Sequence, residues 1–198
     1  MWCEKDLGGL KALLVVGMPG SGKGVFSEVA EKECGLSVFV MGDVVREEII
    51  RRGLELSPET SRRFAIELRR ELGPEAIAIL THRKICSASS LSDYVVIDGV
   101  RSLDEVNYFK RIFGEVVVIA IHASPVTRFQ RLYARGRSDD PRAWSEFVDR
   151  DLMELSLGIG SVIALADHMI VNEDKDLRDL RRIARELLEK ILNKRCRE

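Results

Sequence analysis

The chain has 198 residues, of which 45% are hydrophobic and 32% charged, and this balance excludes a disordered or fibrous protein. The formal net charge is −1, which disfavours a broad electrostatic binder of nucleic acid. Arginine outnumbers lysine by 22 to 9, and because a guanidinium binds phosphate through two donors, the positions of the arginines matter more than their sum.

No apolar run approaches the roughly 18 residues that a membrane span requires, and the N-terminus has no signal-peptide pattern. We therefore expect a cytoplasmic protein without a membrane partner. Its cysteines, Cys3, Cys34, Cys86 and Cys196, are far apart and form no C-x-x-C pair, so we expect reduced structural or surface thiols. The chain has three Asn and one Gln, a composition typical of hyperthermophiles, where intracellular disulfides also occur.

Five short apolar runs recur along the chain, each followed by a glycine or polar residue and then by a helical pattern. They cover residues 12–16, 38–41, 94–97, 116–121 and 169–171. Runs that are apolar on both faces indicate strands buried between two layers of helices. The pattern predicts an α/β fold with an open, five-stranded parallel sheet and ligands beyond the carboxyl ends of its strands.

Helix starts are marked by capping residues. Ser102 begins a capping box, and three Ser-Pro or Asp-Pro pairs place a cap before a proline, at Ser57, Ser124 and Asp140. Residues 177–192 form an amphipathic closing helix, with apolar residues at a spacing of three and four. The pattern predicts helices beginning at each of these caps.

A glycine-rich loop joins the first strand to the first helix in the frame G-x-x-x-x-G-K. It consists of Gly17, Met18, Pro19, Gly20, Ser21, Gly22, Lys23 and Gly24. Glycines let the backbone wrap around an anion, the helix N-terminus adds positive potential, and the lysine reaches the outer phosphates. The loop predicts binding of a nucleoside triphosphate, with ATP as our expectation.

The loop departs from the usual pattern where a Ser or Thr would offer a hydroxyl to Mg²⁺. Gly24 stands there, Val25 follows it, and Ser27 is a full turn further on. Magnesium would then depend on phosphates, waters and a carboxylate elsewhere. Asp98, which ends the third predicted strand, is the candidate for this metal ligand, with a simple Asp-Gly turn as the alternative.

Sequence motifs separate three classes of phosphate-loop protein. A GTPase would need Asn-Lys-x-Asp, but Asn172 is followed by Glu-Asp without the lysine. A motor-type ATPase would place a glutamate after Asp98, where the chain has Gly99. The kinase class remains, in which arginines offset the charge of two phosphate-bearing substrates.

The motifs resemble those of adenylate kinase and other nucleoside monophosphate kinases. The phosphate loop, Gly-Asp-Val-Val-Arg at residues 42–46 and Asp-Gly-Val-Arg at residues 98–101 carry this resemblance, and residues 166–172 are similar to the last strand of dephospho-CoA kinases. Together with residues 122–125 and 135–141 they resemble an archaeal family of ATP-binding, adenylate-kinase-related proteins. The resemblance implies strand order 2-3-1-4-5 and an adenylate-kinase-like body with a lid.

The resemblance also implies site residues. Asp43, Arg46 and Arg101 follow strands at the carboxyl edge of the sheet, where they would bind the acceptor, within an acceptor-binding region over residues 42–90. The alternatives are a helix cap for Asp43 and a solvated position for Arg46. The basic stretch at residues 62–70 either borders the acceptor pocket or is a surface.

A lid-like segment is expected over residues 134–150. Arg128, Arg131 and Arg135 share a helix face, and Arg137 follows in a loop beside Gly136. Such a set of arginines can close over the γ-phosphate. The alternative is that these side chains are merely solvated. We expect Lys23, Arg135 and Arg137 to be the catalytic residues.

The combined expectation is a phosphotransferase that moves the γ-phosphate of ATP, with Mg²⁺, to a small acceptor such as a nucleotide, a nucleoside or dephospho-CoA. One alternative is an adenylate-kinase-like NTPase that assembles or processes RNA or protein, against which the net charge of −1 argues weakly. Another is a nucleotide-binding regulator without turnover, which Gly24 permits. The sequence leaves the acceptor and the oligomeric state open.

Overall fold

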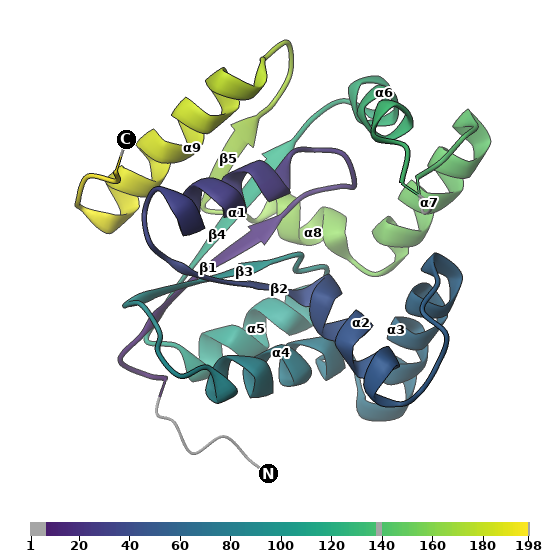
Figure 1. Ribbon diagram of the computed structural model, residues 1–198, viewed down its shortest axis with the longest axis horizontal. Helices are drawn as coiled ribbons and strands as arrows, with labels where there is room; N and C mark the ends of the chain where they lie inside the picture. The colour runs from purple at the N-terminus through teal and green to yellow at the C-terminus, as the bar shows by residue number, and fades with distance from the viewer. Residues whose placement is uncertain (1–6, 138–139, 198) are drawn as a thin grey trace.

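The structure is a computed structural model of the 198-residue chain and describes residues 7–137 and 140–197 (Figure 1). Cys3 lies outside these ranges. Among the helices in them, none is both long enough and apolar enough to cross a membrane.

A parallel sheet of five strands forms the centre of the molecule, in the order β2-β3-β1-β4-β5 (Figure 1). Its strands are β1 (Lys11–Val16), β2 (Ser37–Val40), β3 (Tyr94–Asp98), β4 (Glu115–His122) and β5 (His168–Val171). Each of the five predicted runs is confirmed as a strand within two residues at either end, and the expected order is confirmed as well. The inner strand β1 is flanked by β3 and β4, which explains why its side chains from Ala12 to Val16 are fully buried.

Helices cover both faces of the sheet, and their bounds are α1 (Lys23–Lys32), α2 (Met41–Arg51), α3 (Pro58–Leu72), α4 (Ala76–Ser87), α5 (Leu103–Ile112), α6 (Pro125–Arg135), α7 (Trp144–Ser156), α8 (Ile159–Ala164) and α9 (Leu177–Leu192). One core lies between the sheet and α1 with α9, and the other lies between the sheet and α2, α4, α5 and α8 (Figure 1). The three-layer α/β/α fold is thus confirmed.

Three of the four predicted helix caps are confirmed. Ser57, Ser102 and Ser124 each accept a hydrogen bond from a backbone amide in the first turn of α3, α5 and α6. The prediction at Asp140 is wrong, because α7 begins at Trp144. The Asp140 carboxylate instead accepts hydrogen bonds from the Arg135 side chain, one of them 2.9 Å long, so charge pairing has replaced capping.

The expectation of reduced thiols is wrong for Cys34, Cys86 and Cys196, each of which is disulfide-bonded. Cys34 and Cys196 form a disulfide across 162 residues of sequence. Cys34 follows the end of α1, and Cys196 follows the end of α9, which packs along α1. The backbone amide of Arg197 also donates to the carbonyl of Glu33 at 2.8 Å. Helix packing therefore brings together two cysteines whose spacing in sequence gives no sign of a pair.

Candidate functional site: a phosphate loop beside an arginine-lined cavity

The phosphate loop turns from β1 into α1 at Gly22, whose φ of 107° lies in the left-handed region that favours glycine. A Cβ atom at Gly22 would lie 2.6 Å from the Asn172 amide nitrogen, so a side chain is excluded by space as well as by backbone conformation. At Gly17 a Cβ would lie 2.3 Å from the carbonyl oxygen of Ile121. The loop therefore needs glycine at both positions.

Carbonyl groups of the loop are held by side chains from elsewhere in the fold. Asn172, at the end of β5, donates to the Ser21 carbonyl at 2.8 Å, and Arg128 of α6 donates to the Pro19 carbonyl at 3.3 Å. Helix α1 has no side-chain cap at Gly22 and no acidic residue in its first turn. Its first amides and its dipole are thus available to an anion.

Lys23 is the first residue of α1, and its side chain turns back over the loop. Its Nζ donates to the carbonyl of Gly17 and, at 3.3 Å, to that of Met18. Burial lowers the pKa of the Lys23 ammonium, and the Asp98 carboxylate opposes this shift. The ammonium therefore lies at the mouth of the loop, where an outer phosphate would bind.

Asp98 ends β3 and lies beside the loop, 6% exposed. The Ser27 hydroxyl donates to its carboxylate at 2.8 Å. Burial raises the pKa of the Asp98 carboxyl group, while the Lys23 ammonium and the Ser27 hydroxyl oppose the shift. A carboxylate and a hydroxyl are the oxygen donors that Mg²⁺ prefers when phosphates and waters complete its shell, so these two residues fit the ion that the phosphate loop implies.

Two polar atoms near the loop are buried without a hydrogen-bond partner among the described residues, namely Ser21 Oγ and Arg131 Nη1. Arg131 comes from α6, and its other terminal nitrogen donates to the Asn172 carbonyl at 3.1 Å. Unsatisfied buried donors are rare in proteins and call for an explanation. Their place beside the loop fits a polar ligand there.

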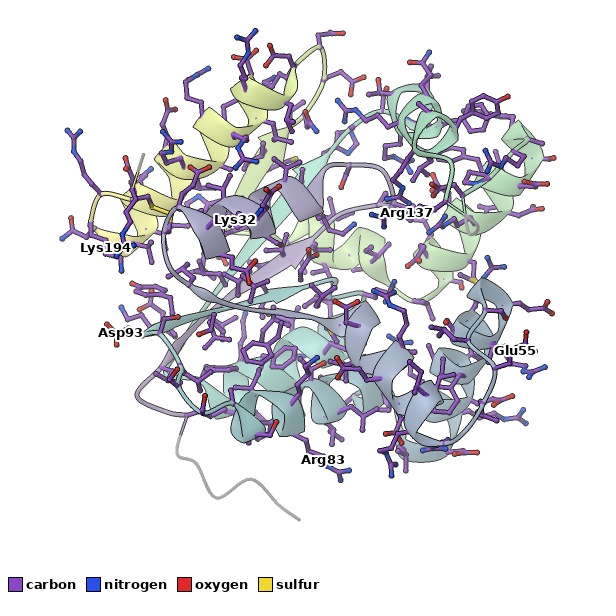
Figure 2. All side chains as sticks on the ribbon, in the orientation of Figure 1. Lys32, Glu55, Arg83, Asp93, Arg137 and Lys194 are labelled. Carbon is purple, nitrogen blue, oxygen red and sulfur yellow. A yellow bond between two sulfur atoms is a disulfide. The ribbon has the colours of Figure 1, made fainter. Side chains whose placement is uncertain are left out.

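The arginines of α6 do not act as one set. Arg128 is 4% exposed, binds Asp151 of α7 at 2.8 Å and packs on the Phe147 ring, so it joins α6 to α7. Arg135 and the backbone amide of Arg137 both donate to Asp140, each with a bond of 2.9 Å. Asp140 thus fixes the loop that carries Arg137. Figure 2 shows Arg137 beside α7.

A cavity of about 440 Å³ opens between α2, α3 and α7. One face of each helix lines it, since the lining residues recur at a spacing of three or four. The lining residues are Gly42, Val45, Arg46, Leu56, Ser57, Ser61, Arg62, Ala65, Ile66, Arg69, Arg101, Arg137, Arg150, Met153, Glu154 and Leu157. Arg46 and Arg101, the arginines expected to bind an acceptor, both lie in the wall of this cavity.

Ion pairs fix several of the cavity's arginines. Arg101 donates through Nε to Glu154 of α7 at 2.8 Å, and its own backbone amide donates to Glu105 at 2.7 Å. Glu105 is fully buried and also pairs with Arg69 of α3 at 2.6 Å. Two carboxylates thus connect the segment after β3 with α3 and α7, and they hold the arginines in position.

Asp43 lies in the first turn of α2, where its carboxylate pairs with Arg46. Its negative charge also contributes to the raised pKa of Asp98, so it lies near the carboxyl end of β3. Asp43 is half-buried and is not among the residues that line the cavity.

Charged residues of the cavity act on the lysine of the phosphate loop. Arg101 and Glu154, which line the cavity, both contribute to the pKa of the Lys23 ammonium, as does Arg150 of α7. These charges act in opposite directions, since Glu154 raises that pKa and the two arginines lower it. A group bound in the cavity therefore lies within reach of the charges around the phosphate tail of a nucleotide.

Several site residues were missed by sequence reasoning. Ser27 is a full turn beyond the position where phosphate loops usually carry a hydroxyl, yet it lies on the side of α1 that faces β3. Glu154 and Arg150 give no sign in the sequence beyond a charged helix face, and Asn172 gives none beyond its place directly after an apolar run. The basic stretch at residues 62–70 was expected either to border the acceptor pocket or to form a surface. Two of its arginines, Arg62 and Arg69, line the cavity.

A parallel sheet with this phosphate loop at the carboxyl end of its first strand defines a phosphate-loop protein with a kinase-like fold. The chain matches the AAA domain family over residues 16–147. It is 54% identical over 161 residues to a UPF0200 protein of Hyperthermus butylicus, covering 81% of this chain and 84% of that one. A UPF0200 protein of Thermococcus onnurineus is 50% identical over 182 residues, covering 91% and 97%. The chain belongs to the UPF0200 family, which confirms the expected resemblance to an archaeal phosphate-loop family.

Solved structures share the fold at low sequence identity. The shikimate kinase of Acinetobacter baumannii in complex with shikimate has a TM-score of 0.57 and 17% identity, over 93% of this chain and 94% of that one. TT1252 from Thermus thermophilus has a TM-score of 0.62 and 17% identity, over 92% and 98%. At such identities the likeness shows the kinase-like fold alone.

Proposed function

We propose that this protein is an ATP-dependent phosphotransferase that transfers the γ-phosphate of ATP to a small acceptor bound in the cavity between α2, α3 and α7. The observation that carries the proposal is the adjacency of two sites. Residues that line the cavity, Arg101 and Glu154, also act on the charge of Lys23 in the phosphate loop. A protein that only hydrolysed ATP would have no need of a second, arginine-lined site there.

Each residue of the phosphate loop region has a role in this proposal. The amides of the loop and of the first turn of α1 bind the phosphate tail of ATP, and the Lys23 ammonium offsets its charge. Asp98, positioned by Ser27, and the Ser27 hydroxyl itself would hold Mg²⁺ together with the phosphates. When bound, the ion neutralises charge on the phosphate oxygens.

The lid-like segment and the acceptor region complete the site. Arg137, whose backbone is fixed by Asp140, offers its guanidinium from the cavity wall to the charge that develops on the γ-phosphate. Arg135 supports this loop through its own pair with Asp140. Arg46 and Arg101 bind the acceptor, and Asp43 would take the proton if the acceptor group were a hydroxyl.

The test is transfer to a panel of acceptors. Purified chain is incubated with ATP, Mg²⁺ and, in turn, nucleoside monophosphates, nucleosides and dephospho-CoA, and both ADP and the phosphorylated product are measured. We expect acceptor-dependent ADP release that the Lys23→Ala variant abolishes, which also excludes a contaminating kinase. If no member of the panel increases ADP release, and RNA or a protein does so instead, the proposal is wrong and the NTPase alternative replaces it.

A further inference from the structure

Asn172 lies where three parts of the molecule meet. It follows β5 directly, and its backbone amide donates to the carbonyl of His122, the last residue of β4, at 2.7 Å. Its side-chain amide donates to the carbonyl of Ser21 in the phosphate loop at 2.8 Å. Because Asn172 is 3% exposed, this second bond is shielded from bulk water and constrains the loop.

Arg131 of α6 fixes the orientation of the Asn172 side chain. Its guanidinium donates to the Asn172 carbonyl at 3.1 Å and to the side-chain oxygen Oδ1 at 3.4 Å. Since Oδ1 faces this donor, the Nδ2 group faces the Ser21 carbonyl, and the reverse orientation would place donor against donor and acceptor against acceptor. Arg131 thus keeps a hydrogen-bond donor directed at the phosphate loop.

Glu173, the next residue, attaches the same segment to the start of α6. Its carboxylate accepts from the backbone amide of Ser124 at 2.8 Å, from the Ser124 hydroxyl at 2.7 Å and from the Thr127 hydroxyl. The Thr127 hydroxyl, followed by the two Ser124 donors, lowers the pKa of Glu173 to about 2, so the carboxylate keeps its charge at neutral pH. Two neighbouring residues after β5 therefore hold both α6 and the phosphate loop.

The bond to Ser21 determines where the next backbone amide points. The peptide between Ser21 and Gly22 is trans, so its carbonyl and its N–H point in opposite directions. While Asn172 holds the carbonyl, the Gly22 amide is directed to the other side of the loop. That amide donates to no acceptor within the described ranges, and it directly precedes the start of α1, where an anion is favoured.

We infer that Asn172 is a positioning residue for phosphate binding, which aims the Gly22 amide at the phosphate tail of a nucleotide by holding the Ser21 carbonyl. The inference rests on the nucleotide binding of the proposed function and goes beyond it by assigning a role to the segment after β5. Asn172 itself does not touch the nucleotide. Without its bond the peptide would have to be ordered when the anion binds, and this cost lowers the affinity.

The test removes the donor without adding a charge. Asn172→Leu keeps a side chain that branches at the same atom but cannot donate a hydrogen bond. Asn107→Leu is the matched control, because it makes the same change at an exposed position of α5, on the other face of the sheet from α1. Binding of inorganic tripolyphosphate and of ATP is measured by calorimetry on the full chain below its melting temperature.

Both dissociation constants are expected to rise about 10-fold or more in Asn172→Leu, which is the usual worth of one hydrogen bond to a charged group. Tripolyphosphate and ATP should lose affinity by the same factor, since the positioned amide binds phosphate and not the base. Asn107→Leu should change neither constant. A merely structural role of Asn172 would lower the melting temperature and leave the affinity of the folded chain unchanged.

An NMR measurement follows the positioned amide directly. Ser21-Gly22 is the one Ser-Gly pair in the sequence, so carbonyl-labelled serine together with nitrogen-labelled glycine selects the Gly22 amide alone. Tripolyphosphate should shift this amide proton downfield in the natural chain, because a hydrogen bond to an anion deshields it, and the shift should be lost in Asn172→Leu. If that variant does not fold, Asn172→Ala, which adds no volume, replaces it with the same expectations.

The outcomes distinguish this inference from the proposed function. Loss of affinity together with loss of the Gly22 shift supports the positioning role. If Asn172→Leu binds tripolyphosphate as tightly as the natural chain, or loses affinity while the Gly22 proton still shifts, the positioning role is wrong and the phosphotransferase stands. If the natural chain binds neither tripolyphosphate nor ATP, the proposed function itself is wrong.

Discussion

Ser27 Oγ donates a hydrogen bond of 2.8 Å to Asp98 Oδ2, and this bond joins the second turn of α1 to the carboxyl end of β3. Phosphate loops usually place a hydroxyl directly after the lysine, whereas this chain has Gly24 there. The hydroxyl that faces the strand carboxylate is thus supplied one turn later. The unusual loop sequence is compatible with Mg²⁺ because Ser27 supplies, further along the helix, the hydroxyl that is missing at Gly24.

Replacement of this hydroxyl is expected to lower the affinity of the site for the Mg²⁺ that catalysis needs. In Ser27→Ala, Asp98 loses a donor that orients it, and such supporting contacts are worth about 10- to 100-fold in metal affinity or activity. We expect the Mg²⁺ concentration for half-maximal ADP release to rise by this factor, with a smaller change at saturating Mg²⁺. A merely structural role would lower thermal stability and leave the Mg²⁺ titration unchanged.

A rescue variant makes this prediction sharper. A Cβ atom at Gly24 would meet no atom within 4 Å, so a serine fits there. We expect Gly24→Ser combined with Ser27→Ala to recover part of the Mg²⁺ affinity. Glycine is also unfavourable in a helix, and its replacement should stabilise α1 by about 0.5 kcal/mol. A double variant no better than Ser27→Ala in the Mg²⁺ titration would contradict the displaced-hydroxyl interpretation.

The raised pKa of Asp98 gives the reaction a pH dependence. Because burial favours the neutral acid, the folded-state pKa lies above that of the unfolded chain, and Asp98 loses its charge at a higher pH than an exposed aspartate. We expect kcat to fall as the pH decreases through this raised value. Excess Mg²⁺ should move the acid limb to lower pH, since the ion favours the carboxylate. An acid limb that does not respond to Mg²⁺ would exclude Asp98 as its source.

The raised pKa of Asp98 also predicts how the stability of the folded chain changes with pH. A carboxyl group with a raised folded-state pKa favours the folded chain at low pH, and that contribution is lost as the pH rises from the unfolded to the folded value. Asp98→Asn has no such titration and can still accept from Ser27. We expect the stability of the natural chain to fall relative to Asp98→Asn across this pH window, as measured by urea unfolding. The variant should also lack transferase activity.

The sequence predicted those features that depend on neighbouring residues. Buried strands follow from continuous apolar runs, and the phosphate loop follows from the glycine spacing around Lys23. The ion pairs between Arg101 and Glu154 and between Arg69 and Glu105 join residues 53 and 36 positions apart. Such partners are set by helix packing, which the local pattern of charges does not predict.

Asp140 shows how a local rule can be overridden. An Asp before a proline normally caps a helix, yet this carboxylate is buried among cations and pairs with Arg135 and Arg150. These pairs and the amide of Arg137 lower the pKa of Asp140, against the effect of burial. A charge taken out of water needs such partners more than a helix end needs a cap.

Removal of the Arg137 side chain separates catalysis from binding. Arg137→Ala keeps the backbone bond to Asp140 but removes the guanidinium from the cavity wall. We expect kcat to fall by about 10²- to 10³-fold, the usual loss when a donor to a developing charge is deleted. The dissociation constant of ATP should change by less than about 5-fold. Arg178→Ala, at the exposed start of α9, is the control and should leave both constants unchanged. A loss confined to ATP affinity would remove Arg137 from the catalytic residues.

The disulfide between Cys34 and Cys196 is expected to stabilise the helix that carries the phosphate loop. It closes a loop of more than 160 residues, since the two positions are 162 apart, and native disulfides of this kind contribute about 2–5 kcal/mol. Glu33, beside Cys34, also binds Arg181 at 2.9 Å and Arg185 at 2.6 Å, so α9 remains attached to α1 without the covalent bond. We therefore expect the Cys34→Ser, Cys196→Ser double variant to fold and to retain transferase activity at 25 °C. Its melting temperature should fall by about 5–15 °C, measured by calorimetry without reductant. An unchanged melting temperature would show that the ion pairs of Glu33 alone hold the two helices together.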